Sequence, residues 1–528
     1  MRDMSQSVVK VQRLSSRVYF ERGSRRLLLK RVMSLFLCVG LLMGVTSCDD
    51  AAPDTQEARG EVTPLISGSL GLTQEELLDP TSCQPCHPTH YAEWANSVHA
   101  HASTSPIFRA LNIVGQEETE GGLGSFCVQC HAPVAVALGA TSDGLNLESL
   151  EPSLQGVTCA YCHQISEVNG THNNPLTWSQ DGVMRGRLSR PRKSAAHRSM
   201  YSSLLDGRQR ASSDVCGACH DIVTPTEVHL ERTYWEWKRS FFSDPRSSRH
   251  NSCIDCHMPS REVDTIAQSA QGVSAESESR RHHDHLMPGV DLVIPTSHSE
   301  YLRAYGASAA QMTTLREAVE RELGFSLLSE LCVEVGARGG ADVEVYLENI
   351  GAGHRFPSGA ALDRRLWVEL RALDADGEVI FSSGEVAPDQ PAVDLELADP
   401  LMWLLRDRAF NSYGEETHFF WEIDRVERAT LPSTTLLSPQ SPDYEEPHVL
   451  RRYRFGTERV VREIHLNVKM RAIGLEVLQN LVDRQLLSQT VMASMPTFDL
   501  RSAHRVWRVE EATPRLTLSG RRLLCTSP

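Results

Sequence analysis

Five copies of a short cysteine–histidine motif constrain this chain more than any other feature. Each copy reads Cys-x-x-Cys-His, and the copies occupy residues 83–87, 127–131, 159–163, 216–220 and 253–257. The spacing is the attachment signature of c-type haem, because two thiols one short turn apart can form thioethers with the two haem vinyl groups. Zinc-binding cysteine pairs are the alternative, but zinc does not require a histidine after every second cysteine.

The motifs therefore predict five covalently attached haem c groups, each containing one iron. The predicted attachment residues are Cys83, Cys86, Cys127, Cys130, Cys159, Cys162, Cys216, Cys219, Cys253 and Cys256. The imidazole that follows each pair is predicted to bind the iron on its proximal side. These proximal ligands are His87, His131, His163, His220 and His257.

Covalent haem attachment of this kind takes place outside the cytoplasm, so an export signal is expected at the N-terminus. Basic residues between 25 and 31 precede an apolar run at residues 32–45, which is short for a membrane-spanning helix. Small residues then lead to Cys48, as in a bacterial lipobox. We predict a lipoprotein signal peptide at residues 1–47, lipid attachment at Cys48 and a flexible tether at 48–80. An ordinary signal peptide with an incidental cysteine is the alternative.

The charge of the chain bears on its partners. Residues 1–47 hold nine Lys and Arg against two Asp and Glu, so their removal moves the formal net charge from −15 to −22. Such an acidic protein is a poor match for nucleic acid or anionic lipid. It suits electron exchange with redox partner proteins that have a basic docking face, although the charge could serve solubility alone.

Residues 81–304 are predicted to form a pentahaem domain. The first cysteines of successive motifs lie 44, 32, 57 and 37 residues apart. Segments of this length cannot each bury an ordinary apolar core, so the haems must supply it. We expect short helices at the motifs, long ordered loops between them, little sheet, and consecutive haems close together.

Histidines are concentrated in the same region. Outside the motifs there are 16, of which 11 lie between residues 80 and 300. This enrichment indicates distal ligation, because imidazole on both faces gives low-spin iron suited to electron transfer. A haem without a second protein ligand would instead be open to a small molecule.

Several stretches resemble the multihaem cytochromes c related to hydroxylamine oxidoreductase and its tetrahaem cytochrome c electron acceptor. The stretches are YAEWANSVHAHA, SAAHRSMYSSLL, TYWEWKRSFF, HHDHLMPG and GAGHRFPSG, and together with the motifs they span about residues 80–360. The resemblance implies four distal iron ligands, namely His99, His197, His285 and His354. Each could instead be an ordinary surface or turn histidine, and His282 and His283 compete with His285.

One of the five irons remains without an assigned distal ligand. The candidates are His90, His101, His172, His229 and His250, and an open position is equally compatible with the sequence. An open iron would be the catalytic centre of an oxidoreductase acting on a small nitrogen or sulfur compound. The catalytic residues of such an enzyme are unknown from the sequence.

Residues 305–528 are predicted to form a β-sandwich-like domain. Alternating apolar residues mark strands around residues 343–347, 366–370 and 464–470, and 374–377 reads as a hairpin turn. A helix is expected at 311–325, and another carries Leu475, Leu478, Val482 and Leu486 on one face. Trp403, Trp421 and Trp507 are expected in its core.

Two cysteines of this domain, Cys332 and Cys525, remain after haem and lipid attachment. They could form a disulfide in an oxidising compartment or stay as buried thiols. The loop at residues 349–359 is expected to reach from this domain into a haem site. There its glycines would let backbone approach the macrocycle, and Phe356 and Pro357 would contact the macrocycle edge.

The sequence thus predicts an α+β multidomain protein with an N-terminal multihaem domain and a β-sandwich-like C-terminal domain. The expected function is electron transfer between periplasmic or cell-surface redox partners. The alternatives are the small-molecule oxidoreductase and a lipoprotein subunit whose β domain docks a partner complex. The expected location is the periplasm or the outer membrane, with membrane contact through the N-terminal lipid.

Overall fold

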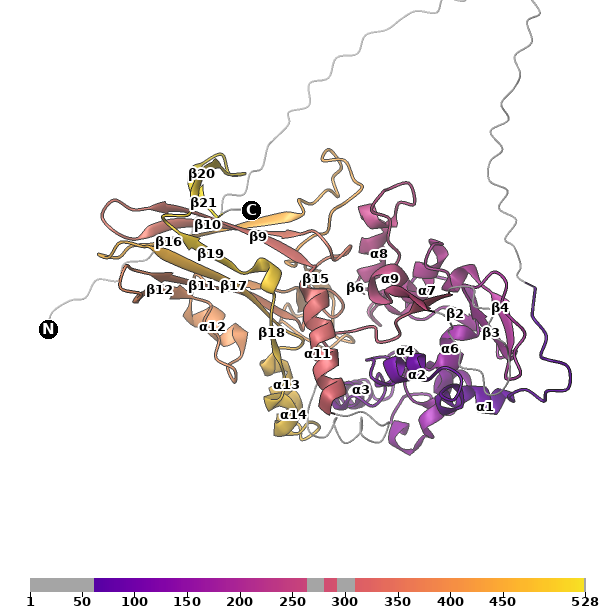
Figure 1. Cartoon of the computed structure of the whole chain (residues 1–528). Coiled ribbons are helices and arrows are strands. Elements are labelled where there is room, and N and C mark those ends of the chain that lie inside the picture. The colour runs from indigo at the N-terminus through magenta and orange to yellow at the C-terminus, as the bar shows by residue number, and fades with distance from the viewer. Residues whose placement is uncertain (1–60, 264–279, 292–308, 527–528) are drawn as a thin grey trace, which may run out of the picture. The chain divides into compact units, whose positions relative to one another are not determined.

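The computed structural model describes residues 61–263, 280–291 and 309–526. Residues 58–528 form one compact unit (Figure 1). The predicted signal peptide, Cys48 and the predicted boundary at residues 304–305 lie outside the described residues. Within the described residues, no helix has both the length and the apolar character that crossing a membrane requires.

Short helices carry the first half of the unit, as the motifs predict. They are α1 (Gln74–Leu78), α2 (Pro88–Ala95), α3 (Pro106–Glu118), α4 (Val128–His131), α5 (Pro133–Ala137), α6 (Cys159–His163), α7 (Ala211–Cys219), α8 (Thr233–Lys238) and α9 (Cys253–His257). Helices this short are not stable alone, so tertiary contacts and capping must hold them. Thr158 and Ser252 supply such caps, accepting hydrogen bonds from backbone N–H groups in the first turns of α6 and α9.

Small two-stranded ribbons lie between these helices, so the region contains more paired strand than we expected. The ribbons are β1 (Ile165–Val168) with β2 (Leu176–Trp178), β3 (Val183–Gly186) with β4 (Arg198–Tyr201), β5 (Ile222–Val223) with β6 (His229–Glu231), and β7 (Ser260–Val263) with β8 (Arg280–His283). The β3–β4 pair is parallel and the other three are antiparallel. In each ribbon, backbone hydrogen bonds join two segments of the loops between the motif helices.

The segment before the first motif differs from the prediction of a tether reaching residue 80. Thr73 and Glu76 form a capping box that begins α1, and Leu77 is buried. The Thr63 N–H donates to the Ser199 carbonyl at 2.8 Å. These local and long-range hydrogen bonds fix residues 63–78 on the rest of the unit, which composition alone does not reveal.

The second half is a two-layer β domain. One sheet has the order β16 (His448–Phe455), β10 (Ala341–Asn349), β9 (Leu327–Val335), β21 (Arg522–Cys525) and β20 (Thr513–Leu516). The other has the order β12 (Val379–Ser383), β11 (Arg365–Leu373), β17 (Glu463–Arg471) and β18 (Thr497–Asp499), with β13 (Trp403–Leu405) on β11 and β19 (Arg505–Arg508) on β17. Figure 1 shows the two sheets as stacked layers.

The core of the β domain lies between the sheets, where the alternating residues place it. One cluster joins Val343, Val345 and Leu347 of β10 with Leu366 and Val368 of β11. All five are fully buried. The mixed helix and sheet composition agrees with the α+β prediction.

Smaller elements complete the β domain. They are α11 (Ala309–Leu323), α12 (Ala392–Ala398), α13 (Leu475–Asp483), α14 (Gln489–Ala493) and the ribbon β14 (Arg408–Phe410) with β15 (Arg425–Glu427). Trp403 and Trp507 lie in the core as predicted. Trp421 instead packs with α3 and α13 and donates to Glu118 at 3.0 Å, so it joins the β domain to the haem-motif region.

Candidate functional site

The five motifs lie in similar local structures. Those at residues 159–163 and 253–257 coincide with α6 and α9, and the motif at 216–220 ends α7. The motif at 127–131 surrounds α4, whereas the first motif is a turn between a 3-10 helix and α2. Pro88 follows that turn and starts α2, because proline fits the first helical position but not a helix interior.

Contacts between thiols show which motifs are neighbours. The Cys83 thiol lies near that of Cys159, the Cys130 thiol near that of Cys219, and the Cys216 thiol near that of Cys253. The first motif thus adjoins the third, and the second adjoins the fourth. Consecutive motifs were expected to be neighbours, and among these contacts only the fourth and fifth are. Long-range packing, which the spacing along the chain does not encode, sets this order.

Four motif histidines face a second imidazole. The ring centroids of His87 and His197 are 6.4 Å apart, those of His163 and His285 6.4 Å, those of His257 and His354 6.5 Å, and those of His220 and His99 6.1 Å. A metal–imidazole bond is about 2.0 Å long, so two rings on opposite sides of one metal ion have roughly this separation. The four pairs fit the two axial positions of a haem iron.

Hydrogen bonds to backbone carbonyls orient several of these rings. Nδ1 of His163 lies 2.6 Å from the Arg185 carbonyl, and Nδ1 of His285 lies 2.7 Å from the His283 carbonyl. A carbonyl can only accept, so each Nδ1 carries the proton and each Nε2 keeps its lone pair. That tautomer is the one a metal ligand needs. His131, His197 and His354 make the same kind of bond.

Burial keeps the imidazole of His99 neutral near pH 7. It is the main cause that lowers the pKa of His99 to about 3, and the nearby His220, His257 and His131 lower that pKa further. A neutral ring is available as a ligand, whereas a protonated ring is not. The Nδ1 atom of His99 is buried without a hydrogen-bond partner.

His354 lies in the loop that follows β10. In the structure, the glycines of this loop make room for neighbouring protein segments. A Cβ on Gly351 would lie 2.0 Å from the Phe325 carbonyl oxygen, so Gly351 admits neighbouring backbone. Gly353 has a positive φ of 73° and faces Phe242. The Phe356 side chain belongs to the β-sandwich core, and its contact with a macrocycle edge stays a prediction.

Arg355 ties the loop to both halves of the unit. Its backbone N–H donates to Glu236 of α8 at 3.1 Å. Its guanidinium donates to Thr430 Oγ1 at 3.0 Å and to Glu445 at 2.6 Å. Burial raises the pKa of Glu236 to about 7. The sequence analysis did not identify Arg355 or Glu236, because their pairing depends on contacts between distant segments.

His131 differs from the other motif histidines. Among the described residues, the ring that lies against it is that of Phe108, with centroids 4.0 Å apart and planes within 9°. Phe108 belongs to α3 and carries no ligand atom, and no sequence motif points to it.

The remaining candidate histidines have other neighbours. His90 lies near His87, His282 and His285, and His172 lies near His229. Nε2 of His101 lies 2.9 Å from the Ala95 carbonyl. Both ring nitrogens of His250 are buried without a hydrogen-bond partner. Within the described part of the chain, none of these five rings lies opposite His131.

Known proteins share both local sequence and fold with this chain. The family described as cytochrome c554 and c-prime matches residues 82–164. The solved structure of a penta-haem cytochrome c552 from Thermochromatium tepidum matches with a TM-score of 0.53 and 18% identity, covering 83% of this chain and 99% of that one. These findings support a multihaem cytochrome c. The family match also supports covalently bound haem c. No curated protein matches the chain.

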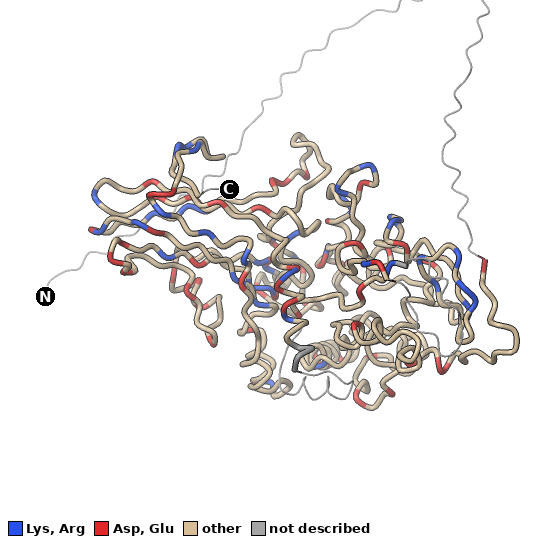
Figure 2. Tube along the Cα trace, viewed as in Figure 1, with Lys and Arg blue, Asp and Glu red and all other residues tan. Residues whose placement is uncertain are grey.

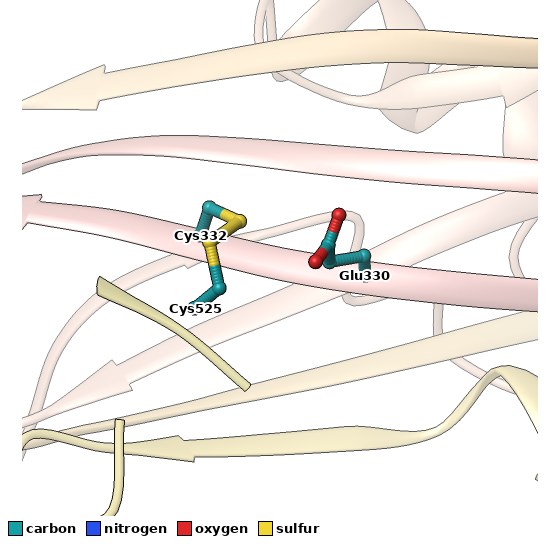
Figure 3. Close-up of side chains that lie close together, drawn as sticks. All are labelled: Glu330, Cys332 and Cys525. Atoms are coloured by element: carbon teal, nitrogen blue, oxygen red, sulfur yellow. A yellow bond between two sulfur atoms is a disulfide. The ribbon is translucent and has the colours of Figure 1, made fainter. Parts of the chain in front are cut away.

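Cys332 and Cys525 form a disulfide between paired residues of β9 and β21 (Figure 3). Glu330 lies beside them and completes a group of three potential metal ligands. The disulfide occupies both sulfur atoms, so neither thiolate is available to a metal ion. The pair therefore stabilises the sandwich, and it lies outside the set of motif histidines.

Proposed function

We propose that this chain is an exported multihaem c-type cytochrome that carries electrons between redox partner proteins through five covalently bound haems. The observation that carries the proposal is the set of four opposed imidazole pairs, each joining a motif histidine to a distant one. Haem iron held between two imidazoles supplies one-electron transfer without an open site for substrate.

The chain's own residues fix these pairs before any electron arrives. Backbone carbonyls hold four of the paired histidines in the ligating tautomer, and His354 is held between the β sandwich and α8 through its neighbour Arg355. Rigid ligands reduce the rearrangement that accompanies a change of oxidation state. Contacts between the first and third, second and fourth, and fourth and fifth motifs would place neighbouring haems at short range.

We further propose that the protein is periplasmic or located on the outer membrane, with lipid on Cys48. These features rest on the export signal and the lipobox-like cysteine. Haem attachment to cysteine thiols and the disulfide between Cys332 and Cys525 both suit an oxidising compartment.

One observation favours a second function. Among the described residues, no imidazole faces His131 at the spacing of the four pairs, and Phe108 stacks directly on its ring with centroids 4.0 Å apart. The haem attached at residues 127–131 would then be open to a small ligand. In that case the protein would be an oxidoreductase acting on a small nitrogen or sulfur compound at this haem.

Optical and electron paramagnetic resonance spectra of the purified holoprotein test the two functions. Electron transfer alone predicts that all haems are low-spin and that their spectra do not respond to nitrite, hydroxylamine or carbon monoxide. An open haem predicts one high-spin signal that shifts with these ligands. A holoprotein whose haems cannot be reduced and reoxidised by a neutral mediator would refute electron transfer.

A further inference from the structure

One stretch of the chain has a charge opposite to that of the whole. Residues 182–205 contain six Lys and Arg and no Asp or Glu, although the formal net charge of the chain is −15. The six cations are Arg185, Arg187, Arg190, Arg192, Lys193 and Arg198. Figure 2 shows this concentration of positive charge around β3 and β4.

Two of the six, Arg185 and Arg187, are not exposed, and each contacts a neighbouring side chain. Arg185 is buried and donates to both carboxylate oxygens of Asp181, at 3.1 and 2.6 Å. Arg187 contacts the ring of His283. These two cations stabilise the β3–β4 segment and contribute little to the surface.

The other four cations are exposed, and we call them the basic patch: Arg190, Arg192, Lys193 and Arg198. Among the described residues, no carboxylate lies within ion-pair distance of Arg190 or Lys193. The guanidinium of Arg198 donates to a backbone carbonyl, that of Asp181, and so keeps its full charge. Exposed cations such as Arg190, Lys193 and Arg198, which have no carboxylate partner among the described residues, present a positive potential to solvent.

The basic patch is held in a defined shape. The Ile66 N–H donates to the Ser194 carbonyl at 3.0 Å, and the Leu72 N–H donates to the Ala196 carbonyl at 2.6 Å. Parallel pairing of β3 with β4 holds the other side of the loop. A surface ordered before binding loses less conformational entropy when a partner docks.

The same loop carries His197. This half-buried side chain faces His87 with ring centroids 6.4 Å apart, which is the first of the four imidazole pairs. Lys193 lies four residues before His197, and Arg198 follows it directly. Exposed cations therefore flank His197 in the sequence, on the same loop that brings this half-buried histidine to His87.

We propose that the basic patch is a docking surface for a redox protein whose redox centre is surrounded by carboxylates. The inference rests on the proposed electron-transfer function, since it makes the His87–His197 pair the entry or exit point for electrons. Complementary charge raises the rate of productive encounter and orients the partner. The net negative charge of the chain opposes such an encounter weakly, because the Debye length at physiological ionic strength is about 8 Å.

Stopped-flow reduction of the oxidised holoprotein by a reduced acidic [2Fe–2S] ferredoxin tests the proposal. In each encounter one electron leaves the ferredoxin and one ferric haem becomes ferrous. The test variant is R190Q/R192Q/K193Q, which leaves His197 and Arg198 in place. The matched control R338Q/R454Q/R501Q removes the same charge from exposed positions of the β domain. Photoreduced riboflavin, a small donor with no protein surface to dock, serves as the reference donor.

We expect the test variant to accept electrons from ferredoxin roughly tenfold more slowly than the wild type at low salt, with a weaker dependence on salt concentration. The control should change less than twofold, and all three proteins should react alike with the flavin. Equal ferredoxin rates for wild type and test variant would overturn the docking proposal and leave the patch a solvated surface. A wild type that the flavin cannot reduce would instead refute the proposed function.

Vesicle flotation separates a protein partner from an anionic membrane. Wild type and test variant are mixed with vesicles of phosphatidylcholine, with and without phosphatidylglycerol. Docking to an acidic protein predicts equal flotation of the two proteins on both vesicle types. Loss of phosphatidylglycerol-dependent flotation in the variant, with an unchanged ferredoxin rate, would overturn the proposal in favour of lipid contact.

Discussion

Histidine nitrogens decide the chemistry of this chain at the scale of single residues. In His163 and His285 a backbone carbonyl accepts a hydrogen bond from Nδ1–H, so the Nε2 lone pair is left for a metal. The opposed pairs join rings from segments far apart in sequence, such as His257 and His354. Each pair therefore depends on both the local loop and the packing between loops.

Replacement of His354 by alanine tests the pair that involves the β domain. Loss of its imidazole should leave one haem with His257 alone, so one low-spin signal should become high-spin in the electron paramagnetic resonance spectrum. His354→Met should keep that haem low-spin and raise its midpoint potential, because thioether ligation favours ferrous iron. His504→Ala, an exposed position in the β domain, is the control. Unchanged spectra in His354→Ala would show that His354 is only a turn residue.

Acidification should disrupt the His99–His220 pair only at a pH well below the ordinary histidine pKa. Burial, with nearby imidazoles, lowers the pKa of His99 to about 3, whereas an unfolded histidine has a pKa of about 6.5. A lowered histidine pKa contributes stability that is present above pH 6.5 and is lost as the pH falls toward the folded value. We expect the low-spin signal of this pair to persist at pH 5 and to disappear below about pH 4 in an optical titration. Its loss near pH 6.5 would contradict this assignment.

Local motifs allowed several site residues to be predicted, while their pairing could not be. The motif cysteines and His354 lie in short stretches whose neighbouring residues are recognisable, so the sequence alone identifies them as candidate site residues. Which imidazole faces which motif depends on how distant loops pack. Phe108 beside His131 has no signal of any kind, since an apolar residue in a helix is most often simply core.

Contacts between elements position the motifs, and the contact between α7 and α8 is especially close. Gly217 lies inside the fourth motif, and a Cβ at this position would be 2.2 Å from the ring of Tyr234 on α8. The Tyr234 hydroxyl donates to Asp214 of α7, which fixes the ring against the helix. The glycine in this motif therefore sets the distance between two helices.

Substitution Gly217→Ala should separate α7 from α8. Overpacking of this kind costs about 1–3 kcal/mol, so the unfolding midpoint of the holoprotein in guanidinium chloride should fall. Gly186→Ala is a matched control, because a Cβ at Gly186 meets nothing within 4 Å. Equal midpoints for the two variants would show that Tyr234 moves aside at no cost.

The disulfide between β9 and β21 should stabilise the sandwich. Cys332 and Cys525 are fully buried and enclose a sequence separation of 193 residues. Chain-entropy arguments give a cross-link of this span up to about 5 kcal/mol. C332S/C525S should therefore unfold at lower denaturant concentration than the wild type, and reductant should bring the wild type toward the variant. A midpoint unaffected by the double substitution would contradict this role.

Periodicity predicted the elements better than composition did. Alternation of apolar residues located β10, β11 and β17, because a sheet buried on one face requires a two-residue period. Composition suggested a tether up to residue 80, but the capping box at Thr73 and the hydrogen bonds to residues 194–199 order that stretch. Amino-acid composition does not predict hydrogen bonds between distant backbone segments.

Polar contacts join the two halves of the whole molecule. Arg428 of the β domain donates to the His229 and Leu230 carbonyls of β6 at 3.0 and 2.9 Å, and to Asp407 at 3.0 Å. Trp421 donates to Glu118, and the Arg355 N–H donates to Glu236. These bonds run between the sandwich and the haem-motif region, on both of which the His257–His354 pair depends.

Because a shared interface holds the two halves, they should unfold as one unit. On heating, the loss of the haem Soret band and the loss of the β-sheet circular dichroism signal should coincide in the wild type. In Arg428→Ala the His229 and Leu230 carbonyls of β6 lose the Arg428 donor, so the domains should come apart before the sandwich melts. The Soret transition should then move to lower temperature while the β-sheet transition moves less. Arg454→Ala, on the exposed side of β16, should leave the two transitions together. Two separate transitions in the wild type would mean that the domains fold independently and that the His257–His354 pair forms only after they dock.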